Sequence, residues 1–175
     1  LGAVNNATFA TPADGKSPRM AMYLWNKTPE PLIINSPSNI AGNYQATIPT
    51  WGGTLTSTPL TKDFVLMLKS ETTGTPYDGC GTFTNTAEIN DKIAIIYRGD
   101  CPFATKVKNA QNAGAKAAII VNNVDGMINM SGDDTTITIP ALSISKADGD
   151  KIVNELQNKV AVNGSLVKTE VSYID

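Results

Sequence analysis

The stretch from Lys92 to Asn123 constrains the fold most, because it has the pattern of a strand, a helix and a second strand. Residues 93–97 and 117–121 are short apolar runs, typical of strands that are buried on both faces. Between them, apolar residues recur at helical spacing from Phe103 onward. A strand, a helix and a strand within about thirty residues predict a right-handed crossover that joins two parallel strands.

The ends of the expected helix carry suitable residues. Pro102 falls in the first turn, where no backbone N–H is needed. Asp100 is placed to accept hydrogen bonds from the free amides of that turn and to favour its positive end. Gly114 suits a left-handed residue that ends the helix. We therefore expect a helix between Pro102 and Gly114, with Phe103 and Val107 on the face toward the core.

Shorter apolar runs flank this unit and complete a mixed fold. Ser145 and Asp148 have the spacing of a helix-capping box, so a second helix is expected after Ser145. The sequence thus predicts an α/β (α+β) domain: a small open β-barrel or sheet with a βαβ crossover and two or more flanking helices. Further strands are expected at residues 31–35, 43–47, 64–68, 139–144 and 164–173.

Residues 1–26 differ from the rest of the chain, because they are rich in turn-forming residues and poor in apolar ones. We interpret them as a flanking segment, either a tail or a linker strand, and assign residues 27–175 to the main domain. The chain lacks an initiator methionine. It is therefore expected to be a processed product or a piece of a longer protein.

Composition excludes several classes of function. The formal net charge is −2 and the 14 basic residues are scattered, so no binding of nucleic acid or of an anionic membrane is expected. No apolar run is long enough to span a bilayer. Histidine is absent, which removes Ser-His-Asp and Cys-His catalysis and the H-E-x-x-H zinc helix. These classes of catalytic site are therefore excluded, and no required cofactor is expected.

We expect the two cysteines to form a disulfide. Cys80 lies in a turn-like Asp-Gly-Cys-Gly run and Cys101 lies at the start of the expected helix. A bridge between them would stabilise the fold by about 3 kcal/mol through loop closure. The alternative is two unpaired buried thiols. The many Asn and Thr residues and the low charged fraction fit a secreted, extracellular protein, where a disulfide persists.

A loop at residues 125–136 carries the candidate metal ligands. Asp125, Asp133 and Asp134 could collect a calcium ion together with backbone carbonyls, because calcium takes hard oxygen ligands. Their spacing matches no EF-hand, and adjacent aspartates in a glycine-containing loop are more often solvated turn formers. Both alternatives stay open. Asp134-Thr-Thr resembles half of an aspartic-protease motif, but the glycine is missing, so we interpret it as a loop.

The same loop carries candidate contact residues for a partner. Met127, Ile128 and Met130 stand in an otherwise polar segment. Because methionine adapts to varied partners, they could form a contact surface; equally, they could fold back over the sheet. Tyr97 and Arg98 follow the first strand of the crossover, at the carboxyl end where crevices form in α/β sheets. These five residues are the predicted substrate-binding or partner-binding site.

Several separated blocks of sequence, in order, resemble the protease-associated (PA) domain. The resemblance covers roughly residues 62–158. The blocks are Arg98-Gly-Asp-Cys-Pro-Phe103, then Lys106, then Ala110-Gln-Asn-Ala-Gly-Ala-Lys-Ala-Ala-Ile-Ile-Val-Asn-Asn123, then Ile139-Pro-Ala-Leu-Ser-Ile144. The resemblance implies a small barrel-like α/β domain without catalytic residues, attached to secreted or vacuolar peptidases and to sorting receptors. Residues 6–25 are similar to a stretch of fungalysin-type zinc metallopeptidases, so the resemblance implies such a parent, with its zinc held outside this chain.

We therefore expect a non-catalytic accessory domain of a secreted metallopeptidase. It would mediate protein–protein interaction, recruit polypeptide substrate, or control access to the parent's active site. Its partner would be the polypeptide substrate or the catalytic domain of the parent. The alternatives are a purely structural spacer and a metal-dependent hydrolase in its own right.

Overall fold

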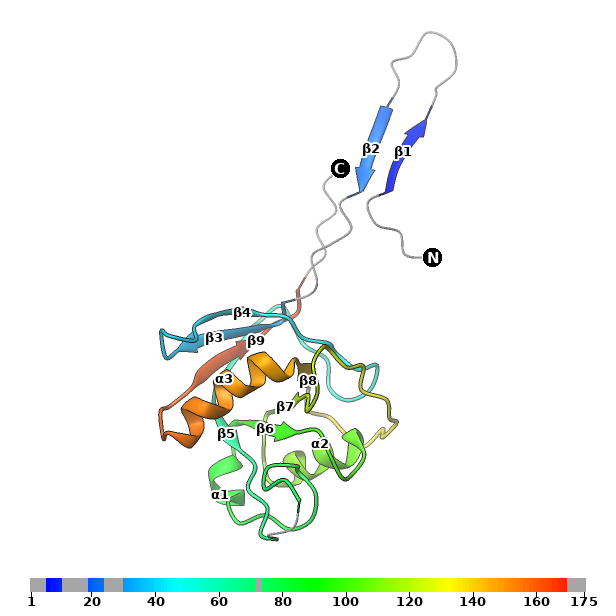
Figure 1. Cartoon of the computed structure of the whole chain (residues 1–175). Helices are drawn as coiled ribbons and strands as arrows, with labels where there is room; N and C mark the ends of the chain where they lie inside the picture. Colours follow the sequence, from blue (N-terminus) through cyan, green and yellow to red (C-terminus); the bar gives the residue numbers. More distant parts are fainter. Residues whose placement is uncertain (1–5, 11–18, 24–29, 72–73, 170–175) are drawn as a thin grey trace.

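The computed structural model describes the backbone of residues 6–10 and 19–23, and residues 30–71 and 74–169 in full. It confirms the predicted mixed α/β class (Figure 1). The strands are β1 (Asn6–Ala10), β2 (Arg19–Tyr23), β3 (Leu32–Ser36), β4 (Gly42–Tyr44), β5 (Leu60–Leu66), β6 (Ile93–Tyr97), β7 (Ala117–Val121), β8 (Ala141–Ile144) and β9 (Asn163–Leu166). The helices are α1 (Thr86–Ile89), α2 (Phe103–Asn112) and α3 (Lys146–Gln157).

Seven of these strands form one mixed sheet, in the order β4-β3-β9-β5-β6-β7-β8. Strands β5 to β8 are parallel, and β9 runs antiparallel between β3 and β5. Thr47, just beyond β4, exchanges two backbone hydrogen bonds of 2.9 Å with Ser143 of β8. Because β4 and β8 are the two edges of the sheet, this bridge closes it into the expected small barrel.

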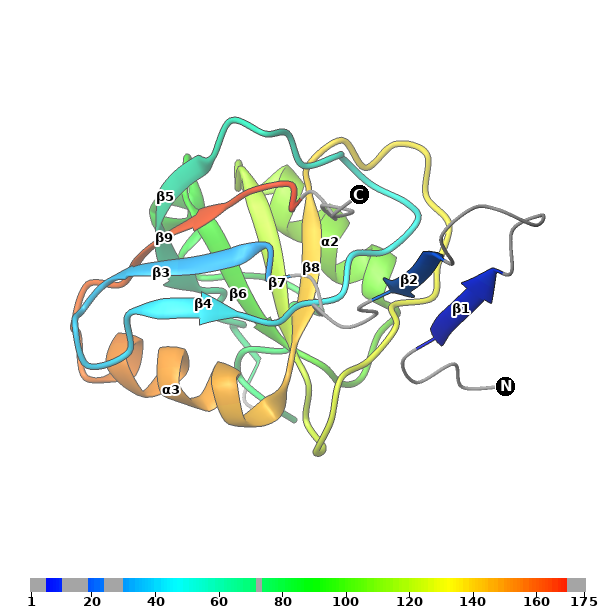
Figure 2. The ribbon, with the colours of Figure 1, turned by 90° about the horizontal axis from the view of Figure 1, so that it is seen from above.

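The predicted crossover is present as β6, α2 and β7. Alternate residues of its strands enter two different cores: Ile93 and Ile95 face one, and Ala94 and Ile96 face the other. The first core lies under α3 and the second under α1 and α2, so helices cover both faces of the parallel strands (Figures 1 and 2). This double burial explains why these strands are continuous apolar runs.

The helix ends agree with the sequence patterns at two of three positions. Gly114 follows α2 with φ +88°. The Ser145 hydroxyl accepts a hydrogen bond of 3.1 Å from the Asp148 amide at the start of α3, and donates one of 3.0 Å to the Asp148 carboxylate. The expectation for Asp100 was wrong, because Pro102 occupies the cap position of α2 and no side chain caps that helix.

A close approach explains the glycine inside α3. A Cβ atom on Gly149 would lie only 2.1 Å from Cγ1 of Val121, in the neighbouring strand β7. Any larger residue would therefore push α3 away from the sheet. Glycine is unfavourable in a helix interior, so packing overrides propensity at this position.

The N-terminal segment differs from the expectation of a tail or a linker strand. Strands β1 and β2 pair antiparallel, with Asn6 opposite Tyr23 and Ala10 opposite Arg19, in a separate two-stranded sheet. The division at residue 26 lies outside the described residues and stays a prediction. The last strand, β9, is shorter than the expected 164–173, and residues 170–175 lie outside the described part of the chain.

Candidate functional site: a groove at the carboxyl ends of β6 and β7

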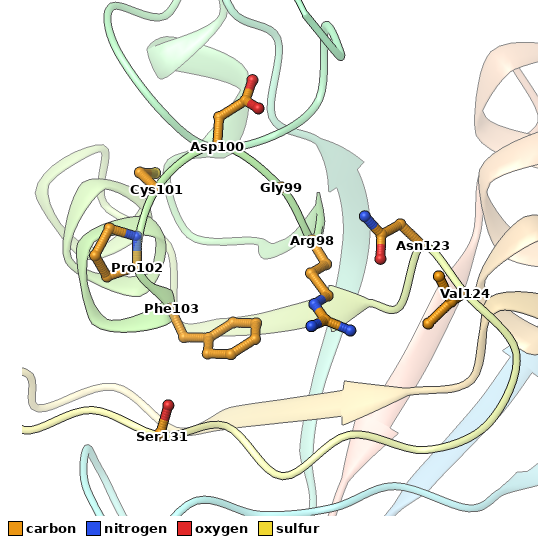
Figure 3. A pocket seen from close by; sticks show the side chains of 9 residues that line it. All are labelled: Arg98, Gly99, Asp100, Cys101, Pro102, Phe103, Asn123, Val124 and Ser131. Atoms are coloured by element: carbon orange, nitrogen blue, oxygen red, sulfur yellow. The ribbon is translucent and has the colours of Figure 1, made fainter.

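An open groove of about 600 Å³ lies where strands β6 and β7 end (Figure 3). Residues 98–103, from the end of β6 to the first residue of α2, form its first wall. Asn123, Val124 and Ser131, from the segment between β7 and β8, form its second wall. The parallel strands thus bring two segments that are distant in sequence to the same edge of the sheet, as the rule for α/β crevices predicts.

Arg98 is the cation of the groove, and the ends of both strands position it. Its backbone amide donates a 2.8 Å hydrogen bond to the Val121 carbonyl, and its guanidinium donates one of 3.1 Å to Oδ1 of Asn122. Asn122 is fully buried, and its amide group donates to the Gly126 carbonyl at 2.9 Å. A buried amide therefore orients the guanidinium, which points into the groove between Phe103 and Val124 (Figure 3).

The remaining groove residues combine apolar and polar surface. The Phe103 side chain is half-buried, packs against the second core and presents its ring to the groove. Val124 on the opposite wall is 54% exposed, which is unusual for a large apolar side chain. Asp100 is exposed at the far end of the first wall, but its carboxylate points away from Arg98 (Figure 3) and acts on Asp78 and Lys69. The groove therefore offers one cation beside apolar surface, and this guanidinium can donate to a carboxylate or a carbonyl.

The predicted disulfide is confirmed and supports the first wall from behind. Cys80 and Cys101 are bonded with their Cα atoms 6.0 Å apart. Because Cys101 lines the groove and Cys80 belongs to a separate loop, the bridge ties residues 76–82 to the first wall.

Lys106 is a buried residue that the sequence analysis missed as part of the site. Its side chain has no exposed surface, and its ammonium donates hydrogen bonds to the Asp78 carbonyl and, at 3.3 Å, to Sγ of Cys80. Burial lowers the pKa of Lys106 to about 8, although the nearby Asp78 acts in the opposite direction. A signal was present, since Lys106 lies three residues after Phe103 and four before Ala110, on the buried face of α2.

Asp78 supplies the matching buried carboxylate. Its two oxygens accept hydrogen bonds of 3.0 Å from the Lys69 ammonium and 2.8 Å from the Cys80 amide. Burial alone would raise the pKa of Asp78, but the Cys80 amide and Lys69 outweigh it and hold the pKa below its ordinary value. Among the described residues, no buried side-chain nitrogen or oxygen is left without a hydrogen-bond partner.

Gly79 allows this loop to lie directly on α2 and β6. Its φ is +70°, in the left-handed region, and a Cβ atom there would lie 2.6 Å from Ile96 and 3.3 Å from Lys106. Asn109 of α2 donates a 2.9 Å hydrogen bond to the Gly79 carbonyl. The loop is therefore fixed to α2 at Gly79, between Asp78 and Cys80.

The second wall is held mainly by apolar packing and neutral hydrogen bonds. The Met130 side chain is only 6% exposed and lies in the second core, and the Met130 carbonyl accepts a 3.2 Å hydrogen bond from the Trp51 indole. The hydroxyls of Thr47 and Ser143 lie in hydrogen-bonding contact with each other and with the Ile128 carbonyl. Each hydroxyl has one proton, so the pair shares two donors among these three contacts. The loop between β7 and β8 is thereby bonded to Thr47 and Ser143, the residues that close the barrel.

The residues predicted to contact a partner therefore do not form one surface. Arg98 lines the groove, whereas Met130 packs inside the core, so the structure does not present Met130 to a partner. Met127 and Ile128 are half-buried beside the groove loop. A role for these two in binding stays a prediction.

Tyr97 does not line the groove. Its hydroxyl donates a 3.1 Å hydrogen bond to the Asp150 carboxylate of α3, on the other face of the sheet. Burial, reinforced by Asp150, raises the pKa of Tyr97 to about 12. Adjacent residues of a strand point to opposite faces, which explains why Tyr97 and Arg98 diverge.

The three aspartates of the calcium prediction do not converge. Among the described residues, no group of three acidic, cysteine or histidine side chains is arranged to hold a metal ion. Asp134 instead accepts hydrogen bonds from the amide and hydroxyl of Thr136, at 2.8 and 2.6 Å, which hold its pKa below the ordinary value. Asp125 and Asp133 are exposed. Calcium binding stays an untested prediction.

Comparison with known proteins identifies the domain type. The family model described as "PA domain" matches residues 60–152. Aminopeptidase YwaD of Bacillus subtilis is 42% identical over 74 residues, covering 40% of this chain and 16% of the enzyme. A receptor homology region, transmembrane domain- and RING domain-containing protein of Oryza sativa is 45% identical over 82 residues, covering 45% of this chain and 15% of that protein.

A solved structure supports the same assignment. The zinc aminopeptidase BSAP of Bacillus subtilis matches with a TM-score of 0.54 and 27% identity, covering 79% of this chain and 30% of that one. The chain thus spans less than a third of these relatives. They give no support to the fungalysin-type parent, which stays a prediction. No helix among the described residues is both long and apolar enough to cross a membrane.

Proposed function

Because the chain belongs to the PA domain family, we propose that it is a non-catalytic accessory domain that binds polypeptides in the groove beside Arg98. The observation that carries the proposal is the placement of Arg98. A buried asparagine orients its guanidinium toward open space, next to the Phe103 ring and the exposed Val124. Such a guanidinium can donate to a carboxylate or to backbone carbonyls of a bound segment.

We also propose that the domain belongs to a secreted zinc metallopeptidase and brings substrate to it. Support comes from the aminopeptidases among its relatives and from the disulfide, which persists in oxidising compartments. The chain contains no histidine and two bridged cysteines, so the catalytic zinc would be held by another part of that protein.

Calorimetric titration of the 175-residue chain with reduced, carboxymethylated casein tests the proposal. Binding is expected, and Arg98→Ala should weaken it about tenfold, the loss typical of a charged hydrogen-bonding group at an interface. Lys116→Ala is the matched control, because it also removes one positive charge but lies 53% exposed on the surface, outside the groove residues.

Three results would overturn the groove as the binding site. Absence of binding would favour the spacer, or a lid that recognises only its own catalytic domain. Equal weakening by Arg98→Ala and Lys116→Ala would show that binding depends only on the net charge of the chain. Binding that is unchanged in Arg98→Ala but weakened by Met127→Ala would move the contact to the loop. Repeating the titration with calcium tests the metal prediction separately.

A further inference from the structure

The contact between Lys106 and the disulfide is not used by polypeptide binding. The ammonium lies 3.3 Å from Sγ of Cys80, whereas Cys101 lies at the groove. The two sulfurs of one bridge therefore have different surroundings. In thiol–disulfide exchange, the sulfur that leaves more readily is the one whose thiolate is better stabilised. The bridge should consequently open in a preferred direction.

The charges around Cys80 favour it as the leaving sulfur. Lys106 is a full positive charge in a buried position, and a neighbouring lysine lowers the pKa of a cysteine thiol. The carbonyl oxygens of Asp78 and Gly99 lie 3.5 and 3.9 Å from the same sulfur, but they are only partial charges. The Asp78 carboxylate is paired with Lys69 at 3.0 Å, which reduces its repulsion of a Cys80 thiolate.

The charges around Cys101 are weaker. The N-terminus of α2 follows it, which would stabilise a thiolate, but Pro102 has no N–H to donate. The carboxylate of the neighbouring Asp100 acts on Asp78, Lys69 and Lys106, so it offsets part of the positive charge near Cys80. A helix terminus acts as about half a charge and is screened by solvent. A buried full charge in contact with Cys80 therefore outweighs it.

We propose that Cys101 is a site of S-thiolation by low-molecular-weight thiols, with Cys80 released as a thiolate beside Lys106. The thiolate of the small thiol attacks Sγ of Cys101 and forms a new S–S bond there. The Cys80–Cys101 bond breaks, and its electron pair stays on Sγ of Cys80. The small thiol is oxidised to the disulfide level and Cys80 is reduced, so no further oxidant is needed.

The attached group would lie at the first wall, where Cys101 is a lining residue and the bridge to Cys80 supports the wall from behind. If the groove binds polypeptides as proposed above, opening the bridge would loosen this wall and weaken that binding. The site of thiolation is measured independently of polypeptide binding, so the two proposals can fail separately.

The test exposes the folded chain briefly to reduced glutathione at pH 7, then alkylates free thiols and digests with trypsin. Cleavage after Lys92 and Arg98 places the two cysteines in different peptides for mass spectrometry. Glutathione on Cys101 with alkylated Cys80 should exceed the reverse arrangement about tenfold, given the dependence of exchange rates on leaving-group pKa.

Substitutions at two lysines of α2 test whether Lys106 causes the preference for glutathione on Cys101. Lys106→Met should bring the ratio close to one, whereas Lys108→Met should preserve it, because the Lys108 ammonium bonds to the Thr136 carbonyl instead of the sulfur. Glutathione mainly on Cys80, an even distribution in the wild type, or a ratio unchanged by Lys106→Met would overturn the proposal. Failure of the folded chain to form any mixed disulfide would also overturn it.

A second measurement remains informative if Lys106→Met does not fold. In Cys101→Ser the free Cys80 thiol should titrate below the usual value of about 8.5 when alkylation rate is followed against pH. In Cys80→Ser the Cys101 thiol should titrate at higher pH than Cys80 does. The reverse order would contradict the assignment of Cys80 as the leaving sulfur.

Discussion

The two walls of the groove are held in place by different physical means. Behind the first wall lie a covalent bridge, a buried ammonium on Lys106 and a buried ion pair between Lys69 and Asp78. The second wall rests on the packed Met130 side chain and on the neutral hydroxyls of Thr47 and Ser143. The first wall should therefore respond to charge changes, pH and reductants, and the second to loss of packed volume.

The largest effect is expected from Asp78→Asn, behind the first wall. The substitution removes the hydrogen-bonded counter-charge of the buried Lys69 ammonium, although Glu71 and Asp100 still act on it. The free energy of unfolding should fall toward the lower end of about 3–5 kcal/mol, the usual cost of breaking a buried pair. Denaturant unfolding measures it. Asp91→Asn is the control, because Asp91 pairs with Lys62 on the exposed surface, and stability should hardly change. Equal losses in the two variants would contradict the buried-charge description.

Met130→Ala tests the second wall and should cost about 2–3 kcal/mol, the lower part of the range of about 2–5 kcal/mol for truncating a buried methionine. Met127→Ala, on a half-buried side chain three residues earlier, should cost clearly less. Both values come from the same unfolding experiment. If Met127 proved the more costly position, the packing assigned to this loop would be incorrect.

The crossover shows how much of this arrangement the sequence could predict. Local sequence patterns predict its strands, its helix, the glycine at position 114 and the disulfide. The spacing of apolar residues, the turn-forming residues and the number of cysteines can all be read directly from the sequence. The burial of Lys106 was missed because a charged residue is normally assigned to the solvent face. Only the position of Lys106 between two apolar residues of the same helical face indicated otherwise.

The second wall was harder to predict, because long-range contacts define it. Nothing local shows that Thr47 will meet Ser143, or that both hydroxyls will bond to Ile128. Met130 could belong to a contact surface or to the core, and only the fold could decide between these two interpretations. Tyr97 and Arg98 were expected to act together, but strand alternation sends them to opposite faces.

A pH titration of stability should distinguish the walls further. The pKa of Lys106 is about 8 in the folded chain and near 10.5 when unfolded, so the unfolded state binds more protons between these values. Stability should consequently rise from pH 8 to pH 10, by about 2 kcal/mol at most. Lys106→Met should abolish the rise. Above pH 10 the raised pKa of Tyr97 makes stability fall with rising pH, because the folded state retains a proton that the unfolded state has released.

A stability that falls steadily from pH 8 in the wild type would contradict the buried, protonated Lys106. Met130→Ala provides the comparison from the second wall. It should lower the whole curve without changing its slope, since no titrating group is removed.

The smallest effect is expected from Thr47→Val. The substitution removes a hydroxyl that bonds to the Ile128 carbonyl, and Ser143 still donates to that carbonyl at 2.7 Å. The loss should be about 1 kcal/mol, typical of one neutral hydrogen bond. A combined Thr47→Val/Ser143→Ala variant should cost more than the sum of the single changes, because the carbonyl then loses both donors. Simple additivity would argue against a shared acceptor.

The most direct test of the central claim is the calorimetric titration of wild-type chain and Arg98→Ala with carboxymethylated casein. The account predicts measurable binding that weakens about tenfold in Arg98→Ala and stays unchanged in Lys116→Ala. Binding that is equally strong in all three proteins would contradict a groove centred on Arg98.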